Sequence, residues 1–318
     1  ARGHMAELPK CMTYARIVSR ESVRLALTIA ALNDLEVKAG DVQNAYITAP
    51  ITEKVWTILG KEFGADAGKR AIIVRALYGL KSAGAAFRKH LADCMRVIGY
   101  TPCLADPDLW MKPATDNDGD KYFSYVLIYV DDVLVISHDA ETVLKKIDKY
   151  FHLKPDSVGD PDMYLSAKLR CHKCNNGVFA WTLSPSKYVR EATQNCVKHL
   201  KENYGGRYSL PKNAPNPFTL NYEPDIDISE PLDPERANYF QSLIGIMRWM
   251  IELGRIDIAT EVSMLSSYLA YPREGHLEAA LHVMAYLRQK HNSRLFFDPT
   301  YPDIDMSTFN TDAEWKEL

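Results

Sequence analysis

Two kinds of hydrophobic pattern divide the chain into helices and strands. Apolar residues recur every three or four positions at Phe87, Leu91, Cys94 and Ile98, which is the spacing of one helix face. Short runs of β-branched and aromatic residues instead predict strands. Helices are predicted at residues 19–34, 82–98, 141–151, 185–203, 235–253, 256–271 and 274–290. Strands are predicted at residues 36–42, 55–59, 71–76, 163–170 and 178–183, with two more inside 122–136.

The order of these elements predicts the fold class. Strands and helices are mixed as far as residue 203, and only helices follow residue 235. Between them, segment 205–234 holds six prolines and few periodic apolar residues, which predicts a loop-like linker. A mixed section followed by an all-helical section predicts an α+β fold.

Composition and charge narrow the partners and the compartment. Of the 318 residues, 47% are hydrophobic, enough for a sizeable core. The net charge is -3, so a nucleic-acid partner would have to be held by local basic clusters. The spacing of the six cysteines does not suggest disulfides, which indicates a reducing, intracellular compartment, either cytoplasm or nucleus. No apolar run reaches the ~18 residues of a membrane span, so we expect no membrane partner.

Two adjacent carboxylates interrupt the strongly apolar stretch 126–136. Asp131 and Asp132 stand between two runs of strand formers, which predicts a hairpin that turns at the pair. Asp-Asp is an unfavourable sequence for a tight turn. The pattern alone is as compatible with an acidic surface turn as with a functional site. Adjacent carboxylates repel unless a cation neutralises them, and their hard oxygens suit Mg²⁺ or Mn²⁺. Asp41, at the end of a predicted strand, is the candidate third ligand for a two-metal site.

A second metal hypothesis concerns zinc. Cys171 and Cys174 lie on a predicted hairpin, just before its Asn-Asn-Gly turn, and Cys196 and His199 share one face of the next predicted helix. Together they could form one tetrahedral zinc site. Separate thiols and a surface histidine are the favoured alternative.

Several stretches together resemble one known family. Tyr129-Val130-Asp131-Asp132 resembles the YxDD signature of reverse transcriptases, and its surroundings resemble the copia-type branch of LTR retrotransposons. The supporting stretches are Asp41-Val-Gln-Asn-Ala-Tyr46, Ala76-Leu-Tyr-Gly-Leu-Lys-Ser82, Ala105-Asp-Pro-Asp-Leu-Trp110, Tyr239-Phe-Gln-Ser-Leu-Ile-Gly245 and Glu274-Gly-His-Leu-Glu-Ala279. The matches run in the family's order from about Tyr14 to Phe297.

The resemblance implies a right-hand polymerase fold. Residues 13–183 would form reduced fingers and a palm, an antiparallel sheet backed by helices. A helix and the Pro-rich linker would follow at 184–234, and a helical thumb at 235–298. Residues 299–318 resemble the start of a truncated RNase H segment, with Asp312 as its first ligand candidate and no RNase H activity expected. Residues 1–12 are interpreted as a cloning tag and tail.

The resemblance also implies template-directed DNA synthesis. The partners would be an RNA or DNA template with a primer, and deoxynucleoside triphosphates, while protein partners stay open. Asp41, Asp131 and Asp132 would hold two Mg²⁺ or Mn²⁺ ions, and the backbone at Val42 would complete the metal site along the triphosphate. Tyr46 would be the steric gate against ribonucleotides, with a core tyrosine as the alternative.

Further roles follow from the same motifs. Tyr78, Gly79 and Lys81 would contact the nucleotide or template, and Tyr129 the primer end. Lys154 would be a general acid for the pyrophosphate. The hairpin 163–183 resembles the primer grip, with basic residues Lys168, Arg170, Lys173 and Lys187. In the thumb, candidate backbone contacts are Arg248, Arg255, Arg273 and His276.

The pattern departs from the family at the fingers. Much of the basic strand that helps to bind the triphosphate is missing, and Arg16, Arg20, Arg24, Arg70 or Arg75 are candidates to replace it. A relic that binds nucleic acid or protein without polymerising is therefore the alternative function. A two-metal nuclease ranks last, because Tyr46 and the Tyr78-Gly79 block would have no purpose there.

Overall fold

The computed structural model describes residues 13–165, 167–175, 177–219 and 222–300. Its first layer is a five-stranded antiparallel sheet in the order β1-β7-β6-β5-β4. These strands are β1 (Glu36–Asp41), β4 (Thr101–Pro102), β5 (Leu109–Thr115), β6 (Lys121–Tyr129) and β7 (Asp132–Ser137). Antiparallel sheets and helices together confirm the α+β class.

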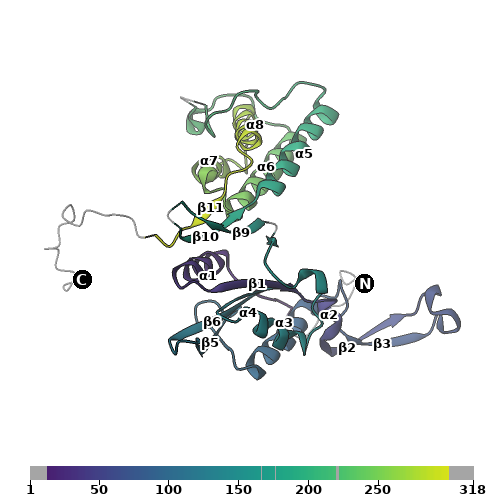
Figure 1. The fold of residues 1–318 in the computed structure, drawn as a ribbon. Helices are drawn as coiled ribbons and strands as arrows, with labels where there is room; N and C mark the ends of the chain where they lie inside the picture. The colour runs from purple at the N-terminus through teal and green to yellow at the C-terminus, as the bar shows by residue number, and fades with distance from the viewer. Residues whose placement is uncertain (1–12, 166, 176, 220–221, 301–318) are drawn as a thin grey trace, which may run out of the picture.

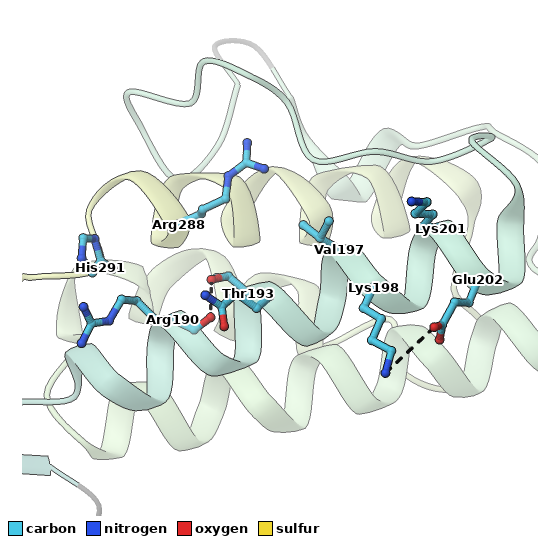
Figure 2. Close-up of a pocket in the computed structure, with 9 residues that line it drawn as sticks. Arg190, Thr193, Val197, Lys198, Lys201, Glu202, Arg288 and His291 are labelled. Carbon is cyan, nitrogen blue, oxygen red and sulfur yellow. Dashed lines mark hydrogen bonds and ion pairs between the residues drawn. The ribbon is translucent and has the colours of Figure 1, made fainter.

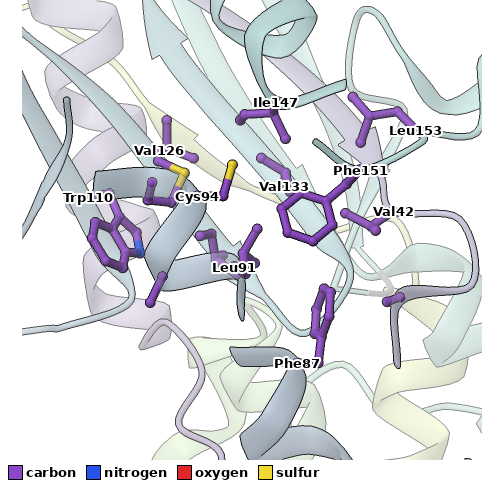
Figure 3. Close-up of a cluster of buried hydrophobic side chains, with 14 of the residues drawn as sticks. Val42, Phe87, Leu91, Cys94, Trp110, Val126, Val133, Ile147, Phe151 and Leu153 are labelled. Atoms are coloured by element: carbon purple, nitrogen blue, oxygen red, sulfur yellow. The ribbon is translucent and has the colours of Figure 1, made fainter. Parts of the chain in front are cut away.

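Alternating side chains of this sheet enter two different cores. Val133 and Val135 point into one core with helices α3 (Ala83–Val97) and α4 (Ala140–Asp148). Figure 3 shows Phe87, Leu91 and Phe151 in this cluster. Leu134 and Ile136 point to the other face, where they pack with helix α1 (Arg20–Leu32). Both faces of β7 are therefore covered, which explains its continuous apolar sequence.

A second antiparallel sheet lies on the other side of α1 (Figure 1). Its order is β11-β10-β9-β8. The strands are β8 (Met163–Tyr164), β9 (Ala167–Lys173), β10 (Phe179–Ser184) and β11 (Leu295–Phe297). Leu169 and Leu183 of this sheet share one core with Leu27 of α1 and Leu127 of the first sheet. Helix α1 thus lies between the two sheets and packs against both.

Four helices build a separate core above the second sheet (Figure 1). They are α5 (Ser186–Tyr204), α6 (Pro234–Glu252), α7 (Ala259–Ser266), which is preceded by the short η5 (Ile256–Ile258), and α8 (Glu274–Gln289). Segment 205–234 contains one short helix, η4 (Pro224–Ile226), among its described residues. Tyr208, Leu210 and Ala214 from this segment are buried in the helical core. The Pro-rich stretch therefore packs along the helices over part of its length.

A two-stranded hairpin projects away from the body of the molecule (Figure 1). It consists of β2 (Pro50–Ile58) and β3 (Arg70–Arg75), with the short helix η2 (Lys61–Asp66) between them. Trp56 and Ile72 pair across it and are both exposed. Neither strand contributes to the first sheet.

Most predicted elements are confirmed, and the missed ones have identifiable causes. Strand β5 was missed because it contains Pro113, and a proline argues against a central strand. The structure accommodates Pro113 because β4 pairs only with Trp110 and Met111, which leaves the β5 edge at Pro113 without a neighbouring strand on that side. Strand β11 has only three residues and depends on pairing with β10. The predicted helix 256–271 is shorter, since α7 ends at Ser266. Within the described ranges, no helix is long and apolar enough to cross a membrane.

Candidate polymerase site

The predicted carboxylates meet at one end of the first sheet. Asp41 ends β1 and pairs with Asp132, the first residue of β7, which also pairs with Tyr129 at the end of β6. Residues paired directly across antiparallel strands point to the same face, with Cβ atoms about 4.5–5.5 Å apart. The fold therefore gathers Asp41, Asp132 and Tyr129 on one face.

The hairpin turns one residue earlier than the sequence predicts. Its two central residues are Val130 and Asp131, and Asp132 already belongs to β7. Val130 has a φ of 58°, a left-handed conformation that a β-branched residue rarely adopts. The backbone N–H of Val42 donates to the Asp131 carbonyl at 2.9 Å, which ties the turn to β1. This strained turn keeps Asp131 beside the other two carboxylates, and such strain is typical of functional sites.

The carboxylates of the site carry more negative charge than the nearby side chains neutralise. Burial, followed by the charges of Asp131 and Asp41, raises the pKa of Asp132 to about 6. Asp41 Oδ1 is buried and has no hydrogen-bond partner among the described residues. No three acidic, histidine or cysteine side chains converge closely enough to hold a metal within the described part of the chain. The orphaned oxygen and the mutual repulsion nevertheless fit a cation between these carboxylates.

Lys154 supplies the positive charge that the site does contain. Its Nζ lies 2.6 Å from Asp41 Oδ2, and this hydrogen bond raises the pKa of Lys154. The same segment also binds the β1 backbone, because Lys154 N–H donates to the Asp41 carbonyl at 2.9 Å. The Ser157 hydroxyl accepts from Asp41 N–H at 2.9 Å and donates to the Lys154 carbonyl at 2.8 Å. Asp41 is thus fixed by its backbone and by one of its two carboxylate oxygens.

An aromatic group lies beside the carboxylates. Tyr46 belongs to the short helix α2 (Ala45–Thr48), which follows directly because Asn44 adopts a φ of 52° and turns the chain. The Tyr46 ring lies 4.6 Å from the Tyr78 ring and 6.0 Å from the Phe87 ring, measured between centroids. Burial, followed by the Asp131 charge, raises the pKa of Tyr46. The ring is therefore half-buried and close to the Asp131 carboxylate.

The block after β3 completes the surroundings of this ring. Tyr78 is exposed, and Gly79 has a φ of 93°, a left-handed conformation that favours glycine. Lys81 is half-buried just before α3. A Cβ atom on Gly84, in the first turn of α3, would lie 3.9 Å from the Tyr46 hydroxyl oxygen. The chain therefore turns tightly at Gly79 and brings the start of α3 next to Tyr46.

The four residues of the zinc hypothesis take part in other contacts or lie at the surface. Cys171 is exposed on β9, whereas Cys196 is buried on α5 and accepts a hydrogen bond from the Tyr239 hydroxyl at 3.2 Å. Burial raises the pKa of the Cys196 thiol, which disfavours the thiolate that zinc requires. His199 stacks on Tyr239 with ring centroids 4.0 Å apart. Cys174 lies at the turn after β9, and the part of the chain that the structure describes does not gather the four ligands.

Two of the arginines that are candidates for triphosphate binding make contacts within the fold. Arg24 Nη2 donates to the backbone carbonyls of Ile251 and Glu252, at the end of α6, at 3.3 and 2.9 Å. Arg20 lies 4.3 Å above the Trp249 ring and pairs with Glu252 at 3.3 Å. Both therefore join α1 to the C-terminal end of α6, where positive charge is favourable.

Three of the residues predicted to contact the nucleic-acid backbone also make contacts within the fold. Arg255 is fully buried and pairs with Asp257 at 2.8 Å. Arg273 donates to the Ser229 carbonyl, and the buried His276 lies 3.1 Å from the Pro224 carbonyl. The prediction that Arg255 and His276 contact a nucleic acid is wrong, because both side chains are buried. Arg273 and His276 hold segment 224–233 to the helices.

Some residues that shape the site escaped sequence reasoning. Asp106 accepts from Ser19 N–H at 2.8 Å and from the Ser22 hydroxyl at 2.6 Å, so it fixes the start of α1. Its signal was the Asp-Pro-Asp stretch, whose other carboxylate, Asp108, pairs with Arg88 of α3 at 2.8 Å. Tyr164 is 2% exposed and, among the described residues, its hydroxyl has no hydrogen-bond partner. Nothing in its local sequence distinguishes it from an ordinary core tyrosine.

Sequence comparison relates this chain to known proteins. The family model described as reverse transcriptase (RNA-dependent DNA polymerase) matches residues 6–195. The retrovirus-related Pol polyprotein from transposon TNT 1-94 of Nicotiana tabacum is 26% identical over 314 residues, 92% of this chain and 22% of that protein. The corresponding polyprotein from transposon RE1 of Arabidopsis thaliana is 22% identical, over 89% of this chain and 18% of its own length.

A shorter relative is covered more completely. The putative transposon Ty5-1 protein of Saccharomyces cerevisiae is 25% identical over 78% of this chain and 74% of its own length. In contrast, the chain spans about a fifth of the length of the two Pol polyproteins. Since the family match covers more than half of the 318 residues, the chain belongs to the reverse transcriptases of copia-type retrotransposons.

Proposed function

We propose that this chain extends a primer by template-directed DNA synthesis. It would transfer a deoxynucleotide from its triphosphate to the primer 3′-hydroxyl and release pyrophosphate. The observation that carries the proposal is the register that places Asp41 opposite Asp132, next to the strained turn at Asp131. A purely structural hairpin has no need of three neighbouring carboxylates, or of a valine with positive φ.

The carboxylates would bind divalent metal ions, as reverse transcriptases generally do. Asp41 and Asp131 would hold two Mg²⁺ or Mn²⁺ ions, with Asp132 contributing less directly and the Val42 backbone beside them. Asp41 Oδ1 is available for this because it lacks a partner among the described residues. When bound, the two ions would lower the pKa of the primer hydroxyl and neutralise charge on the triphosphate.

Lys154 would act on the leaving pyrophosphate. Its ammonium group can donate a proton to a developing pyrophosphate oxygen, and its contact with Asp41 keeps it at the site. The raised pKa means that Lys154 is protonated before the reaction, as a general acid must be.

Tyr46 and its neighbours would select and orient the nucleotide. The Tyr46 ring is supported by Tyr78 and Phe87, so it cannot easily move aside for a 2′-hydroxyl. The backbone at Gly79 and the side chain of Lys81 would contact the nucleotide or template. Tyr129, paired with Asp132, would touch the primer end.

In this proposal the first sheet is the palm, and the β2–β3 hairpin belongs to reduced fingers. The β9–β10 hairpin is the primer grip, and helices α5–α8 form the thumb. Helix α1 with Arg20 and Arg24 then joins palm and thumb.

Primer extension tests the proposal directly. The wild type should add nucleotides to a primer on an RNA or a DNA template with Mg²⁺, and Asp131→Asn should abolish the addition. Asp118→Asn, in the exposed β5–β6 turn, is the matched control and should extend normally. Equal activity of Asp131→Asn and wild type would refute the site. Tight binding of primer-template by the wild type with no incorporation would support the non-polymerising alternative.

A further inference from the structure

A groove lies where the end of α1 and the start of β1 meet the second sheet, and its volume is about 730 Å³. Segment 30–38, residues 160–162 and the strands β9 and β10 contribute to its lining. Glu36 and Asp41 are the first and last residues of β1, and a strand rises about 3.4 Å per residue. The groove, which Glu36 lines, therefore lies about 17 Å along the strand from the carboxylate site.

The charge of this groove is opposite to that of a second groove, between α5 and α8. Figure 2 shows the second groove with Arg190, Lys201 and Arg288 in its lining, on helices that the proposed function assigns to the thumb. Four carboxylates and two fixed positive charges line the groove at the sheets, namely Asp34, Glu36, Asp160 and Asp162 with Lys38 and Arg170. Four negative charges against two positive charges leave an excess of two negative charges.

Two of these carboxylates are not neutralised within the fold. Both positive groups of the lining are already paired, the lysine ammonium with Asp160 at 2.6 Å and the guanidinium with Asp162 at 3.8 Å. Asp34 and Glu36 are exposed and, in the part of the chain that the structure describes, form no ion pair. The last turn of α1, which also lines the groove, contains no basic residue to offset the partial negative charge of a helix C-terminus. The groove therefore favours a cationic ligand.

One side of the groove is an open edge of the second sheet. Strand β8 has only two residues and pairs with the start of β9. Farther along β9, the Leu169 N–H donates away from β10, to the Asp162 carbonyl at 3.0 Å. Backbone groups of alternate residues point to the same side of a strand, so Cys171 and Lys173 present their N–H and C=O groups at this edge. Within the described residues, no backbone group bonds them there, which leaves a template for one more strand.

The floor of the groove is aromatic. In the β9–β10 register, Trp181 lies opposite Cys171 and Phe179 lies opposite Lys173, so these side chains share one face of the sheet. Farther along the strands, this face packs on α1. The Phe179 ring is half exposed and already holds the Lys173 ammonium 5.8 Å from its centroid. The surface therefore accommodates a lysine side chain beside an aromatic ring.

We propose that this groove binds an extended basic peptide of a partner protein, which adds a strand to the open edge of β9. Main-chain hydrogen bonds with β9 would hold the peptide, and every second side chain would enter the groove. A lysine or arginine there can pack its methylene groups on Trp181 and Phe179 and place its charge near Asp34 and Glu36. The inference is independent of the proposed function, because the groove contains none of the residues assigned to nucleotide transfer.

Peptide binding in the absence of nucleotide and nucleic acid tests the proposal. Fluorescence anisotropy of a labelled, alternating lysine–threonine octapeptide gives the Kd for the full chain. Asp34→Asn/Glu36→Gln should raise this Kd by about five- to tenfold at low salt, because two exposed charge contacts are lost. Asparagine suits position 34, because Asp34 has a φ of 50°, which asparagine also adopts. A peptide of the same sequence with N-methylated backbone amides cannot pair with the edge and should bind at least about tenfold more weakly.

The control variant removes the same two charges elsewhere. Glu62→Gln/Asp66→Asn, on exposed positions of the projecting β2–β3 hairpin, should bind the peptide within about twofold of the wild type, because distant exposed charges are screened. An alternating glutamate–threonine octapeptide should not bind.

Four results would overturn the proposal. Equal Kd values of the two double variants would show that the groove carboxylates do not hold the peptide. Equal binding of the glutamate–threonine peptide or of the N-methylated peptide would rule out charge recognition or strand addition. No binding of the lysine–threonine peptide at about 1 mM would show that the groove is not a peptide site. Self-association in analytical ultracentrifugation that is lost in Asp34→Asn/Glu36→Gln would assign the groove to a second copy of this chain instead.

Discussion

Asp41 and Asp132 lie directly opposite each other in the antiparallel pairing of β1 and β7. Like charges at such positions destabilise a sheet. The neighbouring Asp131 adds a third negative charge, and Lys154 bonds only one oxygen of Asp41. The end of this sheet therefore holds like charges next to one another, at some expense to the stability of the fold.

Asp132 should lower the stability of the protein at neutral pH. Its pKa of about 6 lies above the usual value near 3.9, so the folded state holds this proton more tightly than the unfolded state does. Protonated Asp132 therefore makes its full contribution to folding stability below about pH 4. This contribution is lost as the pH rises through about 6. Allowing for solvent screening, Asp132→Asn should raise the free energy of unfolding by about 1–2 kcal/mol at pH 7.5 and change it little at pH 4. Urea denaturation in EDTA at both pH values measures this. Asp118→Asn is the control, and a less stable Asp132→Asn protein at pH 7.5 would contradict the electrostatic account.

Lys154 should contribute to the chemical step more than to binding. Lys154→Met removes the ammonium donor, so the rate of incorporation should fall by about 10²-fold while the nucleotide KM changes little. Lys154→Arg, which keeps the charge but is a poor proton donor, should also leave the nucleotide KM little changed and should recover only part of the rate. Single-turnover kinetics from pH 6.5 to 9.5 provide the measurement. A change confined to KM would assign Lys154 to holding Asp41 and the triphosphate instead.

Tyr46 should control the choice between deoxynucleotides and ribonucleotides. Its ring is held by Tyr78 and Phe87, and replacement by Ala removes the obstacle to a 2′-hydroxyl. The ratio of kcat/KM for ribonucleotide over deoxynucleotide should rise on the order of 10²-fold in Tyr46→Ala. Tyr46→Phe keeps the ring and should retain the wild-type ratio. An unchanged ratio in Tyr46→Ala would mean that Tyr46 is a packing residue, the alternative that the sequence leaves open.

The sequence predicts the carboxylate site better than it predicts the arginines. Asp41 and Asp132 sit at strand ends and Asp131 in the adjoining turn, and strand ends follow from local pattern and pairing. The turn itself was misplaced by one residue, because the pattern does not reveal that Val130 accepts a positive φ. Arg20, Arg24 and Arg255 could not be assigned from sequence, since their partners lie on other elements or depend on how the helices pack. The contacts of a long side chain depend on the tertiary structure and not on the local sequence alone.

Arg24 should hold α1 to α6. Its guanidinium group donates to two carbonyls at the end of α6, and hydrogen bonds from charged groups contribute about 1.5–3 kcal/mol each when partly buried. Arg24→Ala should lower the free energy of unfolding by about 1–3 kcal/mol. Urea denaturation followed by Trp fluorescence reports on the contact between α1 and α6, because Trp249 of α6 lies under Arg20 of α1. Arg16→Ala, at an exposed position before α1, should unfold like the wild type. Equal stability of both variants would mean that the Arg24 contact is not maintained in solution.

Val130 stores strain at the carboxylate turn. A left-handed conformation costs a β-branched residue roughly 1–2 kcal/mol, whereas glycine adopts it freely. Val130→Gly should therefore raise the free energy of unfolding by about 1 kcal/mol. The matched control is Val158→Gly, because Val158 is also partly exposed but has an ordinary φ of -85° and should be destabilised by about 0.5–1 kcal/mol. Urea denaturation of both variants in EDTA gives the two values. If the strain also holds Asp131 in place, the more stable Val130→Gly protein should extend primers more slowly than the wild type. Destabilisation of Val130→Gly to the same extent as Val158→Gly would show that the turn is not strained.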